Sequence, residues 1–303
     1  MFSCSHRRGG FVLVSVLMLG VLLISCATAF TWFVRLQVRS VLRERVALTN
    51  RSMAQVLSRA VINAIAEVSG RTSADSPTQA WFKPLTFPTD DLGTWRVQVT
   101  PLDDRFPIRN LFLPDGNTLR MELRDLWEDL WEALGHRELA VPVLDFLDKN
   151  DTGRVGGVER ESFINRAPLD MSEFLMMGEM TEGILYGEEG RPGLEDFCTI
   201  WSDGRINLNV APVRVLELLP GLDRTRARQL AEYRRENALG SMADVQAMPG
   251  FSARTSMQLT NLAVFKSRYF ALHIEFLDTS AGGTAFDIIF DRTARKVVRW
   301  EES

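Results

Sequence analysis

The feature that most constrains this fold is a run of 24 uncharged residues near the N-terminus, from Phe11 to Val34. A helix of that length is long enough to cross the roughly 30 Å hydrocarbon core of a bilayer. A short leader ending in Arg7-Arg8-Gly9-Gly10 precedes the run, and paired arginines favour leaving that end in the cytoplasm. The run is therefore either a removable signal or a retained membrane anchor.

Two cleavage-like sites lie inside the run. Ala27-Thr28-Ala29 fits an ordinary signal-peptidase site, and Leu23-Ile24-Ser25-Cys26 resembles a lipoprotein box in which Cys26 would be lipidated. The run is nevertheless longer than the 7–15 apolar residues that are typical of a removable signal. A signal peptide, an anchor and a lipoprotein all remain open from this stretch alone.

The residues after the run continue a helical pattern. Apolar side chains recur at helical spacings with five arginines between them, and no Pro or Gly follows Cys26 until Gly70. We therefore predict one helix from about Phe11 to Val68, roughly 90 Å long at 1.5 Å per residue. Its first half is apolar and its second half amphipathic. Cleavage that removed the first half would break this continuous helix, so a removable signal fits the pattern poorly.

The rest of the chain switches between two periodicities. Residues 71–94 are rich in turn-forming residues and are predicted to be a loop. Residues 118–262 are predicted to be mainly helical, with Trp127 and Trp131 on one apolar stripe as core side chains. Alternating stretches predict strands, at Thr94–Thr100, within Asp103–Asn110, and at Phe270–Phe276, Thr284–Phe290 and Lys296–Trp300, with a turn at Gly282-Gly283.

These patterns predict an α+β fold in which sheet residues flank a large inserted all-helical domain. The predicted division is a leader at 1–10, a transmembrane half-helix at 11–34, an amphipathic half-helix at 35–70, a sheet domain at 71–112 and 266–303, and a helical insert at 113–265.

A candidate calcium loop follows residue 147. Counted from Asp148, oxygen-bearing side chains stand at positions 1, 3, 5 and 12, which are Asp148, Asn150, Thr152 and Glu159, with Gly153 at position 6. These are EF-hand spacings, although Thr152 replaces the usual Asp or Asn. The alternative is an acidic turn that closes a helix. We expect any metal here to be structural rather than catalytic, because no His lies nearby in the sequence.

Two Pro-Gly stops, each followed by an apolar residue and a helix, resemble paired helix-hairpin-helix units. They are Pro220-Gly221 and Pro249-Gly250, and Asn209 is predicted to cap the helix that leads into the first. Such pairs often bind DNA phosphates through a Gly-x-Gly turn, but Asp223 and Ser252 stand where the second Gly would be. Residues 203–268 carry 10 basic and 6 acidic side chains. DNA binding remains an alternative that the Asp disfavours.

The leader, the long helix, and the segments DFLDKND…GGVERESF and GRINLNVAP…LLPG resemble the large K-type minor pseudopilins of type II secretion systems. The resemblance covers almost the whole chain. It implies cleavage between Gly10 and Phe11 by a prepilin peptidase and N-methylation of Phe11. The Glu that this family usually carries at the fifth mature position is absent, because Ser15 stands there. That departure fits a subunit at the filament tip.

The resemblance also implies a location and partners. The chain would be a single-pass inner-membrane protein with its C-terminal domain in the periplasm, and would cap or initiate a pseudopilus with other minor pseudopilins and the major pseudopilin. No nucleic-acid partner is expected. The alternative is a membrane-anchored or lipidated periplasmic protein that binds DNA or protein through its helix-hairpin-helix units.

No enzyme is predicted. His136 and His273 are far apart and lack a local motif, Cys198 has no neighbouring His, and no Gly-rich phosphate loop occurs. The net charge of −4 argues against a general nucleic-acid-binding protein. Of the three cysteines, Cys198 alone lies beyond the leader and the apolar run, so no internal disulfide is available there. A structural role in assembly is the prediction.

Overall fold

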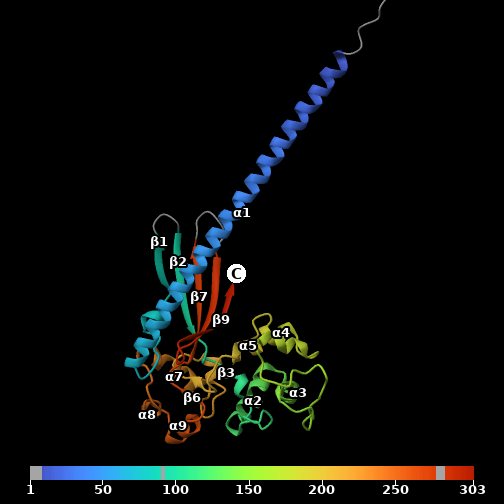
Figure 1. The fold of residues 1–303 in the computed structure, drawn as a ribbon. Coiled ribbons are helices and arrows are strands. Elements are labelled where there is room, and N and C mark those ends of the chain that lie inside the picture. Colours follow the sequence, from blue (N-terminus) through green and yellow to red (C-terminus); the bar gives the residue numbers. More distant parts are fainter. Residues whose placement is uncertain (1–8, 90–92, 278–283) are drawn as a thin grey trace, which may run out of the picture. The chain divides into compact units, whose positions relative to one another are not determined.

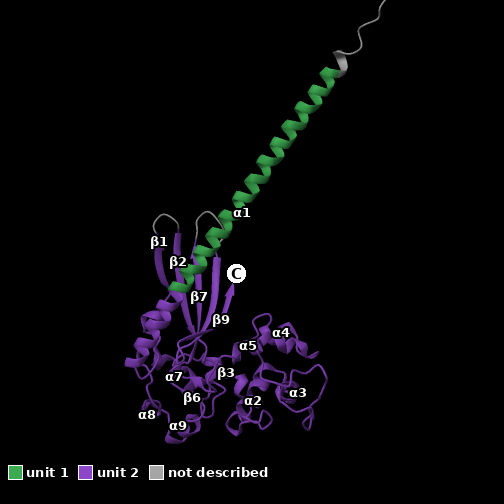
Figure 2. Ribbon diagram, in the orientation of Figure 1, with its two compact units in different colours: residues 1–56 green, residues 57–303 purple. Residues whose placement is uncertain are grey.

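The computed structural model describes residues 9–89, 93–277 and 284–303. The chain divides into two compact units, residues 1–56 and 57–303 (Figure 2). Most of the predicted leader and the predicted Gly282-Gly283 turn lie outside the described residues.

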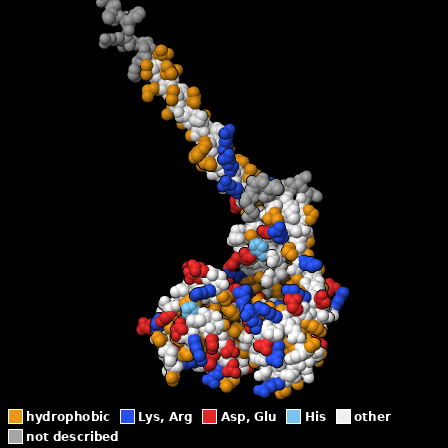
Figure 3. All heavy atoms as spheres, turned by 180° about the vertical axis from the view of Figure 1, so that it is seen from behind, with side chains coloured by type: hydrophobic (Ala, Val, Ile, Leu, Met, Phe, Trp, Pro, Cys, Tyr) orange, Lys and Arg blue, Asp and Glu red, His pale blue; other side chains and the backbone are white. Residues whose placement is uncertain are grey.

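The first element is a single helix, α1, which spans Gly9–Arg71 (Figure 1). It runs without interruption through Cys26 and Ala29, and its bounds agree with the predicted long helix to within three residues. Its N-terminal part is long and apolar enough to cross a membrane, and none of its most apolar stretch is buried. Figure 3 shows apolar side chains covering this part of the helix and basic side chains following them.

Segments at both ends of the remaining chain form a five-stranded antiparallel sheet. Its strands, in spatial order, are β1 (Leu85–Thr89), β2 (Gly93–Pro101), β7 (Tyr269–Leu277), β8 (Thr284–Asp291) and β9 (Lys296–Glu302). Thus β2 pairs with β7 across the whole insert, with Val97 opposite Ile274. The four strands predicted from alternation in these segments are all present.

Alternation explains which face of the sheet is buried. Val97, Ile274 and Phe286 lie in register on neighbouring strands and are at most 1 % exposed. Phe270 stacks on Phe290 with ring centroids 5.3 Å apart, which adds an aromatic pair to this layer. Ile65, in the last turns of α1, is buried.

The prediction that residues 71–94 form a loop is wrong in part. This segment contains a short 3₁₀ turn at Ala80–Phe82 and the edge strand β1, which pairs with β2 from Leu85 opposite Val97. Pro88 makes β1 hard to predict as a strand, because Pro cannot donate a ladder hydrogen bond. It is tolerated here because β1 is an edge strand, where the missing N–H is not needed. Trp81, which precedes it, packs edge-on against Phe270 of β7.

The insert between β2 and β7 is built of short helices. They are α2 (Met121–Leu134), α3 (Ala140–Leu147), α4 (Glu182–Tyr186), α5 (Leu194–Phe197), α6 (Val213–Leu216), α7 (Arg224–Glu236), α8 (Met242–Ala247) and α9 (Ala253–Leu259). Two parallel pairs of two-residue strands accompany them, β3 (Phe106–Pro107) with β4 (Cys198–Thr199) and β5 (Ile206–Asn207) with β6 (Ala263–Val264). The insert is therefore mainly helical and also contains two short pairs of strands.

One continuous apolar core holds the insert together. It reaches from Phe106 to Ala263 and includes Trp127 and Trp131, whose rings meet edge to face with centroids 5.5 Å apart. The core role predicted for the two tryptophans is correct. Phe106 and Leu111, which the predicted boundary after residue 112 groups with the sheet, belong to this core. The short strand predicted within Asp103–Asn110 is β3, which pairs with β4 of the insert.

Candidate functional site

The points where the insert leaves and rejoins the sheet are held by a buried carboxylate, Asp103. Its Oδ2 accepts hydrogen bonds from the backbone N–H groups of Arg268 (2.7 Å) and Tyr269 (2.9 Å), and its Oδ1 accepts one from Asp203 (3.1 Å). Burial raises the pKa of the Asp103 carboxyl to about 6, although these N–H donors act in the opposite direction.

A second buried carboxylate, Asp75, lies just after α1. It accepts hydrogen bonds from Arg292 Nη1 (2.6 Å), the Ser267 N–H (2.5 Å) and Asn207 Nδ2 (3.3 Å). Arg292 comes from the turn between β8 and β9, and Asn207 from the GRINLNVAP segment. The charge is thus surrounded by donors from three distant segments, which is the arrangement a buried carboxylate requires.

The prediction that Asn209 caps a helix is wrong. Pro212 stands at the N-cap of α6, and the Asn209 side chain is buried. Its Nδ2 donates to the Leu239 carbonyl (2.8 Å) and its Oδ1 accepts from the Leu239 N–H (2.9 Å). A second donation reaches the Phe265 carbonyl. The amide therefore satisfies backbone groups of two remote loops instead of a helix end.

The candidate calcium loop brings together only part of the predicted ligand set. Asp148 is fully buried, and Glu159 lies close to it and to Asp145. Asn165 Nδ2 donates to Glu159 Oε1 over 3.3 Å. By contrast, the predicted ligand Asn150 accepts from the Thr152 N–H, and the predicted ligand Thr152 is exposed. Spacing alone could not have added Asp145 and Asn165, because a fold-back of the chain places them.

In this cluster the carboxylates outnumber the basic side chains. The cluster holds three carboxylates, those of Asp145, Asp148 and Glu159, and one guanidinium, that of Arg154, which pairs with Asp145 (3.0 Å) and with Asp148. Burial raises the pKa of Asp148 and, with the neighbouring carboxylates, that of Glu159. Within this cluster, three buried oxygens have no hydrogen-bond partner among the described residues: Asp148 Oδ1, Glu159 Oε2 and Asn165 Oδ1.

The donor set suits a hard cation. All candidate ligands are carboxylate or amide oxygens, as Ca²⁺ prefers, and uncompensated buried oxygens are costly. In the described part of the chain, however, no three His, Cys, Asp or Glu side chains are already placed around one point to hold a metal ion. The Arg154 guanidinium forms ion pairs with Asp145 and Asp148, two carboxylates that would bind the cation. Cation binding would therefore require this guanidinium to move away.

The hairpin units have the predicted outline but not a phosphate-binding turn. Gly221 and Gly250 both adopt positive φ, near 80°, as Pro-Gly stops require. The following Asp223 and Ser252 are the N-caps of α7 and α9, accepting from Arg226 N (2.9 Å) and Thr255 N (3.2 Å). The side chain at each second-glycine position therefore occupies the helix N-terminus to which a phosphate would otherwise bind.

The groups considered for catalysis are separated. Cys198 is buried, and burial raises the pKa of its thiol, which keeps it from acting as a nucleophile. His136 and His273 lie on different elements and pair with Glu138 and Asp287 respectively, at the surface. The remaining predicted site residues, Gly10, Phe11 and Ser15, lie on α1 near its start.

No family model and no curated protein matches the sequence. Among solved structures, a chain in the crystal structure of the GspK–GspI–GspJ complex from the enterotoxigenic Escherichia coli type 2 secretion system is similar, with a TM-score of 0.66 and 18 % identity. The match covers 88 % of this chain and 99 % of that chain. At this identity the likeness is one of fold: a pilin-like α+β fold with a helical insert.

Proposed function

We propose that this chain is a minor pseudopilin of a type II secretion system, of the K type, located at the tip of the pseudopilus. The observation that carries the proposal is the likeness in fold, which spans nearly the whole of both chains and includes the insert. GspK, GspI and GspJ form a complex in that structure, so we propose companion minor pseudopilins as partners here.

The exposed surface of α1 supports a role in assembly. Until the subunit is extracted into the filament, its apolar residues between 12 and 34 would hold it in the inner membrane. Further along, apolar side chains that include Leu36, Val38, Val41 and Leu42 are each at least 43 % exposed. Exposed apolar side chains in such number mark a surface that a partner covers. In the proposal, neighbouring pseudopilin helices cover it by side-by-side packing.

Processing and the tip position follow from the start of α1. A prepilin peptidase would cut between Gly10 and Phe11, Phe11 would be methylated, and Ser15 would be the fifth mature residue. In pilin-like filaments a Glu at that position is thought to neutralise the free amine of the preceding subunit. A tip subunit does not need this charge, and a bulky insert would hinder another subunit of its kind from stacking above it.

Labelling this subunit within assembled filaments tests the tip assignment. A small epitope tag at the C-terminus, decorated with gold-conjugated antibody, should mark one end of each pseudopilus. Labels spaced along the filament length would rule out the tip position. Companion minor pseudopilins should co-purify with the full-length chain from detergent-solubilised membranes.

We further propose that the cluster of Asp145, Asp148, Glu159 and Asn165 holds a structural divalent cation, with Ca²⁺ the best match for its oxygen donors. The three unpartnered buried oxygens and the unbalanced negative charge support this proposal. A bound cation would supply the counter-charge that Arg154 now provides to Asp145 and Asp148.

A further inference from the structure

A basic pocket lies in the unit formed by residues 57–303. Its volume is about 760 Å³, within the range of pockets that hold ligands of several hundred daltons. Five basic side chains and one acidic one line it, namely Arg205, Lys266, Arg268, Arg292, Arg295 and Asp203. They come from the loop before β5, the link from β6 to β7, and the turn between β8 and β9. The end of α1 supplies a further wall.

Three of these five cations already have carboxylate partners. Arg205 pairs with Asp203, Arg268 with Asp291, and Arg292 with Asp75. Lys266 has no carboxylate partner in the described part of the chain; its Nζ donates to the Ser69 carbonyl at the end of α1 over 2.7 Å. Arg295 is exposed and has no ion-pair partner among the described residues. Two positive charges are thus available to a ligand.

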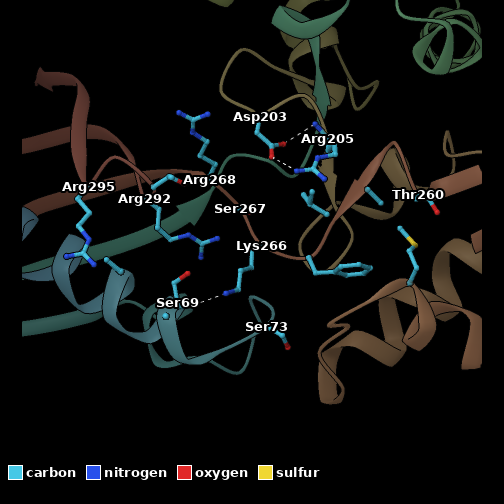
Figure 4. A pocket seen from close by; sticks show the side chains of 17 residues that line it. Ser69, Ser73, Asp203, Arg205, Thr260, Lys266, Ser267, Arg268, Arg292 and Arg295 are labelled. Carbon is cyan, nitrogen blue, oxygen red and sulfur yellow. Dashed lines mark hydrogen bonds and ion pairs between the residues drawn. The ribbon is translucent and has the colours of Figure 1, made fainter.

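The two available cations do not converge on one point. In Figure 4, Lys266 extends across the middle of the pocket toward Ser69, whereas Arg295 lies at one rim and Arg205 on the opposite side. A compact ion could not reach all of these groups. An extended ligand that carries more than one negative charge could contact both available cations.

Three backbone N–H groups at the pocket are not free to bind a phosphate. Phosphate is usually held by free N–H groups at a helix N-terminus or in a nest of successive amides. Here the N–H of Ser267 donates to Asp75, that of Arg268 to Asp103, and that of Thr293 to Asp291. These amides are occupied by the protein's own carboxylates, so side-chain cations remain as the ligand-binding groups.

Part of the pocket lining is apolar. Met242, Val264 and Phe265 line it and are only partly buried. A ligand that placed an apolar side chain here and carboxylates near Lys266 and Arg295 would match both parts of the lining.

We infer that this pocket binds an acidic, extended segment of another protein, in which carboxylate side chains flank an apolar one. The inference goes beyond the proposed function and does not depend on it. Carboxylates would pair with Lys266 and Arg295 at the partly exposed surface, so the attraction should weaken as salt rises.

Calorimetry on the full-length chain in a neutral detergent at low ionic strength tests this inference. The probe is an acetylated, amidated peptide of alternating Glu and Leu, and the matched control peptide has Gln at every Glu. Binding of the Glu peptide but not of the Gln peptide is expected. Arg295→Gln and Lys266→Gln should each weaken binding about three- to tenfold, as expected for a charged hydrogen-bonded contact that is partly screened.

Lys296→Gln provides the matched control variant, because Lys296 is exposed beside Arg295 but does not line the pocket. Its affinity for the Glu peptide should equal that of the unchanged protein. Arg295→Gln is the cleaner of the two test variants, since Lys266 also supports the end of α1; unfolding temperatures of all variants identify any loss that comes from misfolding.

Three results would overturn the inference. The first is no binding of the Glu peptide at low salt. The second is equal weakening by Lys296→Gln and Arg295→Gln, which would mean general charge attraction. The third is displacement of the peptide by equimolar inorganic phosphate or short-chain phosphatidylglycerol, which would assign the site to a phosphate group.

Discussion

Arg292 and Asp75 form a buried ion pair, with Nη1 and Oδ1 2.6 Å apart and side chains 8 % and 1 % exposed. The two residues are 217 positions apart in the sequence. The pair therefore ties the segment after α1 to the turn between β8 and β9. Because the guanidinium also lies over the Phe270 ring, 5.1 Å from its centroid, the pair joins the sheet core as well.

Breaking this pair should be costly. Arg292→Met leaves the Asp75 carboxylate buried without its cation, and we expect the free energy of unfolding to fall by about 3–5 kcal/mol. Urea denaturation of the full-length chain measures the change. Arg96→Met is the control, because Arg96 pairs with Glu275 at a partly exposed site; there the loss should stay below about 1 kcal/mol. Similar losses in both variants would contradict the assigned role.

The raised pKa of Asp103 makes stability depend on pH. The folded state keeps this proton up to about pH 6, whereas the ordinary pKa is 3.8. Between these values the folded state binds a proton that the unfolded chain has released, so stability falls as pH rises from about 4 to 6 and is constant above. The contribution is about 3 kcal/mol at 1.36 kcal/mol per pKa unit.

Comparison with Asp103→Asn isolates this contribution from that of other carboxylates. The free energy of unfolding of the unchanged protein should decline relative to that of the variant across pH 4–6. Parallel pH profiles would show that Asp103 ionises normally in the folded state.

The long helix and the sheet are readable in the sequence because their signals are local. Uninterrupted helical spacing predicts α1, and strict alternation predicts β2, β7, β8 and β9. What was missed depends on distant partners. The sequence around Asn209 predicts a helix cap. Its side chain instead donates hydrogen bonds to the carbonyls of Leu239 and Phe265. Propensity rules carry no information about such contacts.

The candidate cation cluster shows the same limit at a smaller scale. The EF-hand spacing includes Asp148 and Glu159, which lie close together. Asn165 enters because its backbone N–H bonds the Phe146 carbonyl in a left-handed conformation with φ of 44°, which turns the chain back on itself. A linear template cannot include a ligand that reaches the site through such a turn.

Calcium should stabilise the protein through this cluster. With Ca²⁺ at 100 times its dissociation constant, the free energy of unfolding should rise by about 2.7 kcal/mol, and a chelator should reverse the change. Glu159→Gln should abolish most of the response, whereas Asp151→Asn, an exposed acid in the same loop, should not. An equal calcium response in all three proteins would place the effect elsewhere.

The hairpin units should serve packing rather than DNA binding. Asp223→Ala removes the N-cap of α7 and should cost about 1 kcal/mol of stability, whereas Asp223→Gly should cost only a few tenths. The unchanged protein should not retard duplex DNA in a gel at physiological salt. Retardation that is lost when Arg224 and Arg226 are both replaced by Ala would instead favour the DNA-binding alternative.

The intact mass of the membrane-extracted protein tests the central claim most directly. It should be measured with and without a co-expressed prepilin peptidase. The proposal predicts loss of residues 1–10 and gain of one methyl group on Phe11, only when the peptidase is present. A lipidated product that begins at Cys26, or an unchanged full-length mass under both conditions, would contradict the assignment as a pseudopilin.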